Sequence, residues 1–167
     1  MRISDENLRQ NRLVFYEQDV CRLDGELDGF LEFSGARCAV LIDCEGHLVT
    51  RRGDTVSASL DSLAALMAGS FAATKEIAHQ LGEASFSTLL HQGDQQSIQV
   101  SIVGERTLFC VVWDERSNFG LVRFYAQETT KRLEQIFTEM SEPKDNPSAT
   151  LSDGYSDEAT AALDDLF

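Results

Sequence analysis

Three strand-like runs in the second half of the chain constrain its fold more than any other feature. They cover Ser85 to His91, Ser97 to Val103 and Thr107 to Trp113, and apolar and polar residues alternate along the middle run as in a half-buried strand. The links between them, Gln92 to Gln96 and Gly104 to Arg106, are far shorter than the roughly dozen residues that a parallel crossover needs. The three runs are therefore predicted to form an antiparallel meander.

The remaining apolar periodicity predicts two further strands and three helices. Strands at Arg37 to Asp43 and His47 to Arg52 flank a short polar turn and are predicted to form a hairpin. Helical spacing marks three segments: Leu13 to Ser34, Ser59 to Gly82 and Asn118 to Met140. In the last of these, Leu121 and Tyr125 are among the residues predicted to face the core. The predicted order is α-β-β-α-β-β-β-α, and the fold class is α+β, with a five-stranded antiparallel sheet and helices on both faces.

The central helix, from Ser59 to Gly82, is apolar on two opposite faces. One stripe gathers large apolar residues and is predicted to face the core: Leu63, Leu66, Met67, Ile77 and Leu81. The opposite face carries small residues and one glutamate: Ala65, Ala68, Gly69, Ala72 and Glu76. A glycine inside a helix costs about 1 kcal/mol relative to alanine, and a solvated face normally carries long polar side chains. This face is predicted to bind a second copy or another protein, with simple alanine-rich helix propensity as the alternative.

The formal net charge of −14 excludes two classes of partner. Nucleic acids and anionic membrane surfaces both require basic patches, so neither is expected to bind. No apolar run reaches the roughly 18 residues needed to cross a bilayer, and the polar start resembles neither a signal peptide nor a presequence. The protein is therefore expected to be cytoplasmic. Its four cysteines show no C-x-x-C spacing and are expected to be structural or bystander residues.

The composition divides the chain into four parts. Residues 1–12 form a polar extension, residues 13–141 the folded domain, and residues 142–155, which hold both prolines, a flexible linker. Residues 156–167 are predicted to form a short amphipathic helix that folds on a partner, and its binding residues are Leu163, Asp164, Asp165, Leu166 and Phe167. The alternative is a frayed acidic terminus that binds nothing or docks weakly on its own domain.

Motifs of catalysis are absent from the sequence. It contains neither a G-x-x-x-x-G-K-[ST] phosphate loop nor a G-x-G-x-x-G turn, so no nucleotide cofactor is expected. The three histidines lie at no ligand spacing from one another or from a cysteine, so no metal site is expected. The chain is thus predicted not to be an enzyme. A small-molecule sensor is a further alternative, but only Ser97, Gln99 and Ser101 offer a polar row that could line its pocket.

Several segments together resemble the Roadblock superfamily, and within it the MglB group of bacterial regulators. They are the small-residue run from Leu63 to Ala73, the turn from Ser101 to Arg106, and the stretch from Asp114 to Asn118 that leads into Phe119 to Arg123. The acidic Leu-Phe end, Asp164 to Phe167, is similar to the end of MglB tails. The resemblance covers about Phe15 to Met140, and the polar extension and extra cysteines depart from the pattern.

The resemblance implies a homodimer joined edge to edge through the third strand, with interface residues Phe86, Leu89 and Leu90. It also implies that the two central helices form a platform for a small Ras-like GTPase of the MglA type, on Ala65, Ala68, Gly69, Ala72 and Glu76. MglB-like activators stimulate GTP hydrolysis by reshaping the switch regions, so none of the four candidate arginines is expected to act as a finger: Arg51, Arg52, Arg106 and Arg116. The alternative is a non-catalytic Roadblock scaffold in a cell-polarity or motility complex. The same resemblance suggests concentration at a cell pole.

Overall fold

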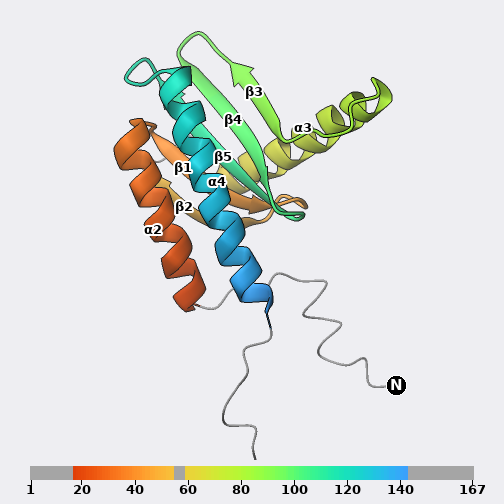
Figure 1. Ribbon diagram of the computed structural model, residues 1–167. Coiled ribbons are helices and arrows are strands. Elements are labelled where there is room, and N and C mark those ends of the chain that lie inside the picture. Colours follow the sequence, from red (N-terminus) through yellow and green to blue (C-terminus); the bar gives the residue numbers. More distant parts are fainter. Residues whose placement is uncertain (1–16, 55–58, 143–167) are drawn as a thin grey trace, which may run out of the picture.

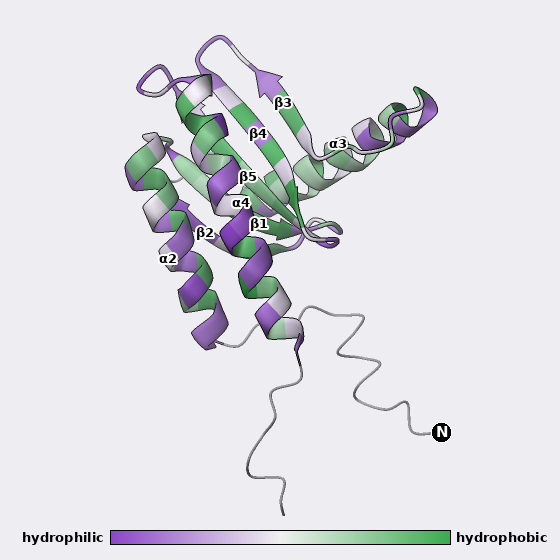
Figure 2. Ribbon diagram, viewed as in Figure 1, coloured by the Kyte–Doolittle hydropathy of each residue, from purple (hydrophilic) through white to green (hydrophobic). Residues whose placement is uncertain are grey.

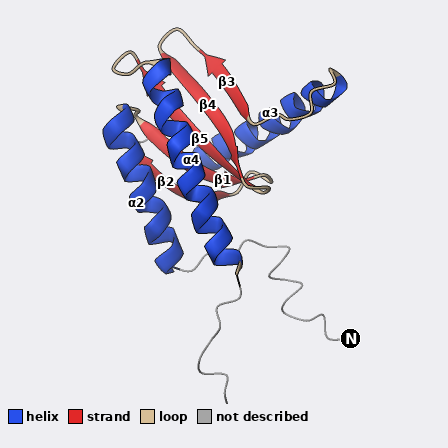
Figure 3. Cartoon of the chain, in the orientation of Figure 1, coloured by secondary structure: helices blue, strands red, loops and turns tan. Residues whose placement is uncertain are grey.

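Five strands and three helices make up the part of the chain that the computed structural model describes, residues 17–54 and 59–142 (Figures 1 and 3). The helices are α2 (Glu17–Ser34), α3 (Leu60–Gln80) and α4 (Phe119–Ser141). The strands are β1 (Cys38–Asp43), β2 (Leu48–Gly53), β3 (Thr88–Gln92), β4 (Gln96–Val103) and β5 (Thr107–Asp114). The predicted element order is confirmed. The polar extension, the linker and the terminal helix predicted from the sequence lie outside the described residues.

All five strands belong to one antiparallel sheet with the order β2-β1-β5-β4-β3. The central strands β1 and β5 are buried along almost their whole length, as their continuous apolar sequences require. The short links after β3 and β4 produce the predicted meander, and β1 pairs with β5, with Cys38 opposite Val112. This topology leaves β2 and β3 as the two edges of the sheet.

The helices cover the sheet in two layers, with α2 and α4 on one face and α3 on the other (Figure 1). Under α2 and α4, the ring of Phe109 meets Phe30 edge to face, with ring centroids 5.2 Å apart. On the opposite face of the sheet, Met67 and Phe71 of α3 pack on the side chains of β1 and β5 that point away from α2 and α4. The two cores explain why both faces of the central strands are apolar.

Polar contacts fix α2 against the edge strand and against α4. Asp28 accepts two hydrogen bonds from the Arg52 guanidinium of β2, at 2.7 and 2.8 Å. Glu26 of α2 lies 3.7 Å from Arg132 of α4. Exposed pairs of this kind contribute little to stability individually, so they mainly set the orientation of a helix pair that the apolar core holds. No helix in the described ranges is long and apolar enough to span a membrane.

The cysteines fall into two classes of exposure. Cys38 and Cys110 are buried in the core beneath α3, whereas Cys21 and Cys44 are exposed, and all four are free thiols. Burial raises the pKa of the Cys110 and Cys38 thiols, so both stay protonated. A protonated buried thiol acts as a small apolar side chain, which agrees with the structural role expected for these two residues.

The turn between β1 and β2 approaches α3 at Gly46. This residue has φ +94°, and a Cβ atom there would lie 2.8 Å from the Cα atom of Ala65. Gly82, just after α3, has φ +83° but would meet nothing within 4 Å. The two glycines therefore separate the effect of backbone conformation from the effect of close approach.

Gly46→Ala is expected to destabilise the domain more than Gly82→Ala. Each variant places a side chain on a backbone in the left-handed conformation, which lowers the free energy of unfolding by about 1–2 kcal/mol. Gly46→Ala loses roughly 1–3 kcal/mol more, because the new methyl group overpacks against α3. Urea unfolding of the two variants and the parent chain measures the difference. Equal destabilisation by both would mean that the turn can move away from α3 at no cost.

Candidate functional site

The inward face of α3 is made largely of small side chains. Its buried residues are Ala64, Met67, Ala68, Phe71 and Ala78. Ala68 was predicted to lie on the outward face and to bind the GTPase, and this is wrong because its side chain packs on the sheet. Alanines at 64 and 68 let the helix axis approach β1 closely, while Met67 and Phe71 fill the space on either side.

The outward face of α3 carries the other four predicted contact residues, Ala65, Gly69, Ala72 and Glu76, all of them exposed. A Cβ atom added at Gly69 would meet nothing within 4 Å, so no contact among the described residues, 17–54 and 59–142, requires the glycine. At Ala65, Gly69 and Ala72, the short side chains leave the helix backbone accessible to a large partner.

Three large apolar residues at α3 are also exposed, contrary to the prediction that they face the core. Leu66, Ile77 and Leu81 are 67%, 58% and 78% exposed. α3 has apolar residues around most of its circumference. Its alanine-rich side packs on the sheet, because short side chains let the helix approach the strands more closely. We call the exposed small and apolar residues of α3, with Glu76 and the adjoining Leu81, the α3 surface: Ala65, Leu66, Gly69, Ala72, Glu76, Ile77 and Leu81. Exposed apolar area of this kind marks an interaction surface.

The free edge of β3 adjoins the α3 layer. β3 begins at Thr88 rather than Ser85, because Phe86 turns onto Phe71 of α3, with ring centroids 5.0 Å apart. Phe86 and Leu89 are half-buried against the α3 core, and Leu90 is exposed. Of the three predicted dimer residues, Leu90 is thus the one whose side chain is most available to a second copy.

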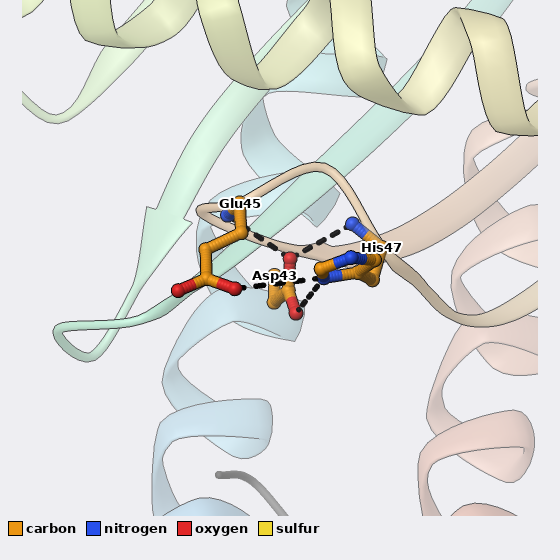
Figure 4. Close-up of side chains that lie close together, drawn as sticks. All are labelled: Asp43, Glu45 and His47. Atoms are coloured by element: carbon orange, nitrogen blue, oxygen red, sulfur yellow. Dashed lines mark hydrogen bonds and ion pairs between the residues drawn. The ribbon is translucent and has the colours of Figure 1, made fainter. Parts of the chain in front are cut away.

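The β1–β2 turn gathers Asp43, Glu45 and His47, a combination that the sequence analysis did not identify (Figure 4). One Asp43 carboxylate oxygen accepts hydrogen bonds from the backbone N–H groups of Glu45 and His47, and the other lies 3.0 Å from His47 Nδ1. The potential ligand atoms of the three residues lie within 4.8 Å of one another, which suits a divalent cation. The same contacts also account for the turn itself, so they are consistent with a purely structural role.

Ion pairs within the chain hold the candidate arginines Arg52 and Arg116. Arg52 binds Asp28, and Arg116 donates to Asp114 at 3.1 Å. These hydrogen bonds raise the pKa of both guanidinium groups, and the Arg116 bond lowers the pKa of the Asp114 carboxyl. A finger arginine must reach into a neighbouring active site, so Arg52 and Arg116 would first have to break these pairs.

Gln99 and Ser101, two residues of the β4 polar row, form side-chain hydrogen bonds within the protein. Gln99 and Ser101 are buried, the Gln99 amide donates to Ser101 Oγ at 3.1 Å, and Thr88 Oγ1 lies 3.5 Å from the same atom. Side chains satisfied in this way offer nothing to a ligand. The row therefore gives no support to the small-molecule sensor considered from the sequence.

Comparison with known proteins identifies the family. The sequence model of the Roadblock/LC7 domain matches residues 23–112, more than half of the chain. The chain belongs to the Roadblock/LC7 family. No curated protein sequence matches it significantly. Roadblock proteins with the MglB architecture are regulatory and scaffolding proteins rather than enzymes.

Solved structures place the Roadblock domain near MglB. The gliding protein MglB from Thermus thermophilus is 35% identical with a TM-score of 0.72, over 76% of this chain and 96% of that one. Myxococcus xanthus MglB is 32% identical with a TM-score of 0.72, over 80% of this chain and 100% of that one. An MglB described as having a tetrameric arrangement is 34% identical, with the same TM-score and the same coverage as the Thermus protein. The chain is thus an MglB-like Roadblock protein.

Proposed function

We propose that this protein is a homodimeric regulator of a small Ras-like GTPase of the MglA type and that it stimulates GTP hydrolysis. The observation that carries the proposal is the α3 surface, where small residues and three large apolar side chains are exposed together. An apolar area of this kind on a domain of this size needs a protein partner. The similarity to MglB over most of the chain supports a GTPase as that partner.

Pairing of two copies would enlarge this surface into a platform. The unpaired β3 edge of one copy would add to the β3 edge of the other, and Leu90, Ile77 and Leu81 would lie close to the two-fold axis. Ala65, Gly69 and Ala72 would remain on the outside of the paired helices. A smooth surface of this kind lets the backbone of a GTPase approach both helices.

The proposed mechanism acts on the GTPase switch regions and uses no arginine finger. Contacts with the α3 platform would stabilise the switch conformation in which the GTPase's own residues reach the phosphates, so activation is a population shift. An arginine finger contributes about 10³- to 10⁵-fold in rate where one is used. Arg51→Ala and Arg106→Ala are therefore expected to retain nearly full stimulation.

The direct test is a single-turnover hydrolysis assay. The GTPase is captured from the source cell on immobilised protein, purified, loaded with GTP and assayed with and without the dimer. A rate increase that saturates with dimer concentration supports the proposal. Tight binding without any rate increase would instead identify a Roadblock scaffold, the alternative considered from the sequence.

Removing the tail is expected to weaken the GTPase complex without affecting the folded domain. A chain that ends at Glu142 keeps every described element, so its melting temperature should be unchanged. Burial of each large apolar side chain of the tail would contribute about 1.5–3 kcal/mol to binding, before ordering costs; these side chains are Leu163, Leu166 and Phe167. Their loss should therefore lower affinity roughly tenfold or more. Binding titrations at low and high salt measure this effect and any contribution from Asp164 and Asp165.

The matched control is Leu151→Ala, which removes an apolar side chain from the predicted linker rather than from the predicted helix. It should bind like the parent chain, whereas Phe167→Ala should not. A large fall in melting temperature on truncation would contradict the proposal, because it would mean that the tail packs on its own domain.

A further inference from the structure

Two carboxylates and one imidazole converge at the β1–β2 turn, on Asp43, Glu45 and His47 (Figure 4). His47 Nδ1 lies 3.0 Å from Asp43 Oδ2 and 3.7 Å from Glu45 Oε2. Imidazole nitrogen and carboxylate oxygen are ligand atoms that first-row divalent metal ions bind. The mixture of a nitrogen donor with two oxygen donors distinguishes this cluster from a simple group of acidic side chains.

The separations of these atoms suit the coordination sphere of a small divalent ion. Metal–ligand bonds of about 2.0–2.2 Å place two ligand atoms about 3 Å apart at a right angle and about 3.4 Å apart at the tetrahedral angle. The distances of 3.0 and 3.7 Å from His47 Nδ1 lie close to these values, and all three ligand atoms lie within 4.8 Å of one another. One ion could therefore bind all three residues after small rotations of the Glu45 and His47 side chains.

The turn itself needs only part of the cluster. Its main-chain bond runs from the Gly46 N–H to the Asp43 carbonyl at 3.0 Å, and Asp43 Oδ1 accepts from the N–H groups of Glu45 and His47. These bonds use neither the imidazole nor the Glu45 carboxylate. Because they hold Oδ1, they fix the direction of Oδ2, in the way that hydrogen bonds commonly orient a ligating carboxylate.

Contacts with two neighbouring elements hold the turn in place. The Cys44 N–H donates to the Arg106 carbonyl, in the turn between β4 and β5, at 3.0 Å. On the other side, Gly46 lies so close to α3 that an added Cβ atom would be 2.8 Å from the Cα atom of Ala65. Because the backbone is already fixed, ion binding would order mainly two side chains, which lowers its entropic cost.

We propose that Asp43, Glu45 and His47 form a binding site for a divalent transition-metal ion, with Zn²⁺ as the best fit. Each residue would supply one ligand atom: Oδ2, Oε2 and Nδ1, respectively. An imidazole ligand and only three protein ligands disfavour Mg²⁺ and Ca²⁺, which bind about six or more oxygen atoms. The remaining coordination positions would hold water or a side chain of a bound protein.

A bound ion would lie at the border of the α3 surface, because the turn adjoins Ala65. The cluster is hydrophilic, whereas the α3 helix over the sheet is largely hydrophobic (Figure 2). Two charged carboxylates at this border would be costly for a protein partner to cover, and a divalent ion would neutralise them. This consequence rests on the proposed function, whereas metal binding itself does not.

The test titrates Zn²⁺ into the full chain, tag-free and stripped of metal, by isothermal titration calorimetry, alongside Asp43→Asn and His47→Gln. Asparagine at 43 keeps the Oδ1 acceptor that the turn needs but replaces Oδ2 with an amide nitrogen, and His47 is 73% exposed, so both variants should melt like the parent chain. We expect the parent chain to bind one Zn²⁺ ion and each variant to bind it about a hundredfold or more less tightly. Excess Mg²⁺ should not displace the ion.

The matched controls are His79→Gln and Cys44→Ser. His79 lies 3.9 Å from Glu76 on α3, an exposed imidazole–carboxylate pair that belongs to no cluster of three ligands within residues 17–54 and 59–142. Cys44 is an exposed thiol in the same turn. Both controls should bind Zn²⁺ like the parent chain. Equal affinity in the parent chain and His47→Gln, or loss of binding in Cys44→Ser alone, would overturn the site, and because no GTPase is present, neither result depends on the proposed function.

Discussion

Gly69→Arg is expected to lower GTPase affinity by roughly a hundredfold or more without destabilising the chain. The position is open, because a Cβ atom there meets nothing within 4 Å, and a non-glycine residue in an exposed helix gains up to about 1 kcal/mol. In the complex, the long side chain would hold the partner away or bury an unpaired charge, which costs about 3–5 kcal/mol. Each 1.4 kcal/mol or so corresponds to a tenfold loss of affinity.

The matched control for this prediction is Gly25→Arg on α2, where an added Cβ atom also meets nothing within 4 Å. It introduces the same residue into an exposed helix position on the opposite layer. Isothermal titration with the purified GTPase should give wild-type affinity for Gly25→Arg and a strong loss for Gly69→Arg. If both bind like the parent chain, the α3 surface does not contact the GTPase. Ala68→Arg is unsuitable as a test because Ala68 is buried and the variant would unfold for other reasons.

Leu90→Lys is expected to separate the proposed dimer into single chains at low micromolar concentration. Leu90 is 38% exposed on β3, which is an edge strand among the described residues, and a lysine there opposes sheet pairing by charge and by loss of apolar contact. Because the platform is proposed to need two α3 helices, GTPase affinity should fall together with the dimer. Light scattering and the hydrolysis assay report the two effects independently.

The other edge of the sheet supplies the control. Leu48 of β2 is also 38% exposed on an unpaired edge, so Leu48→Lys makes the same chemical change at the far side of the sheet. The variant should keep both the dimer and the stimulation. Loss of the dimer in Leu48→Lys, with Leu90→Lys unaffected, would move the interface from β3 to β2.

Most of the fold follows from local sequence. Short links define the meander, and continuous apolar runs identify β1 and β5 as central strands. The start of β3 does not follow, because the sequence gives no sign that Phe86 leaves the strand path to meet Phe71. Leu121 was predicted to face the core and is exposed instead, because α4 turns its Val122 side to the sheet.

The candidate site could be predicted only in part. The small residues of α3 indicated an interaction surface. Which apolar side of the helix faces the sheet depends on how closely each side packs against the strands. Alanines at 64 and 68 let the helix pack more closely on the sheet than Leu66 would. Periodicity alone does not identify the buried side, because leucine and alanine are both apolar. The cluster of Asp43, Glu45 and His47 matches no ligand spacing between histidine and cysteine residues in the sequence. It forms because a hairpin turn brings alternate residues together.

If paired α3 surfaces form a platform for one GTPase, the mass of the complex reports it. Light scattering on the GTP-loaded GTPase mixed with excess protein at low micromolar concentration gives the stoichiometry. We expect two copies of the chain for each GTPase, and loss of that species in both Gly69→Arg and Leu90→Lys. A stable complex of one chain with one GTPase, unaffected by either substitution, would contradict it.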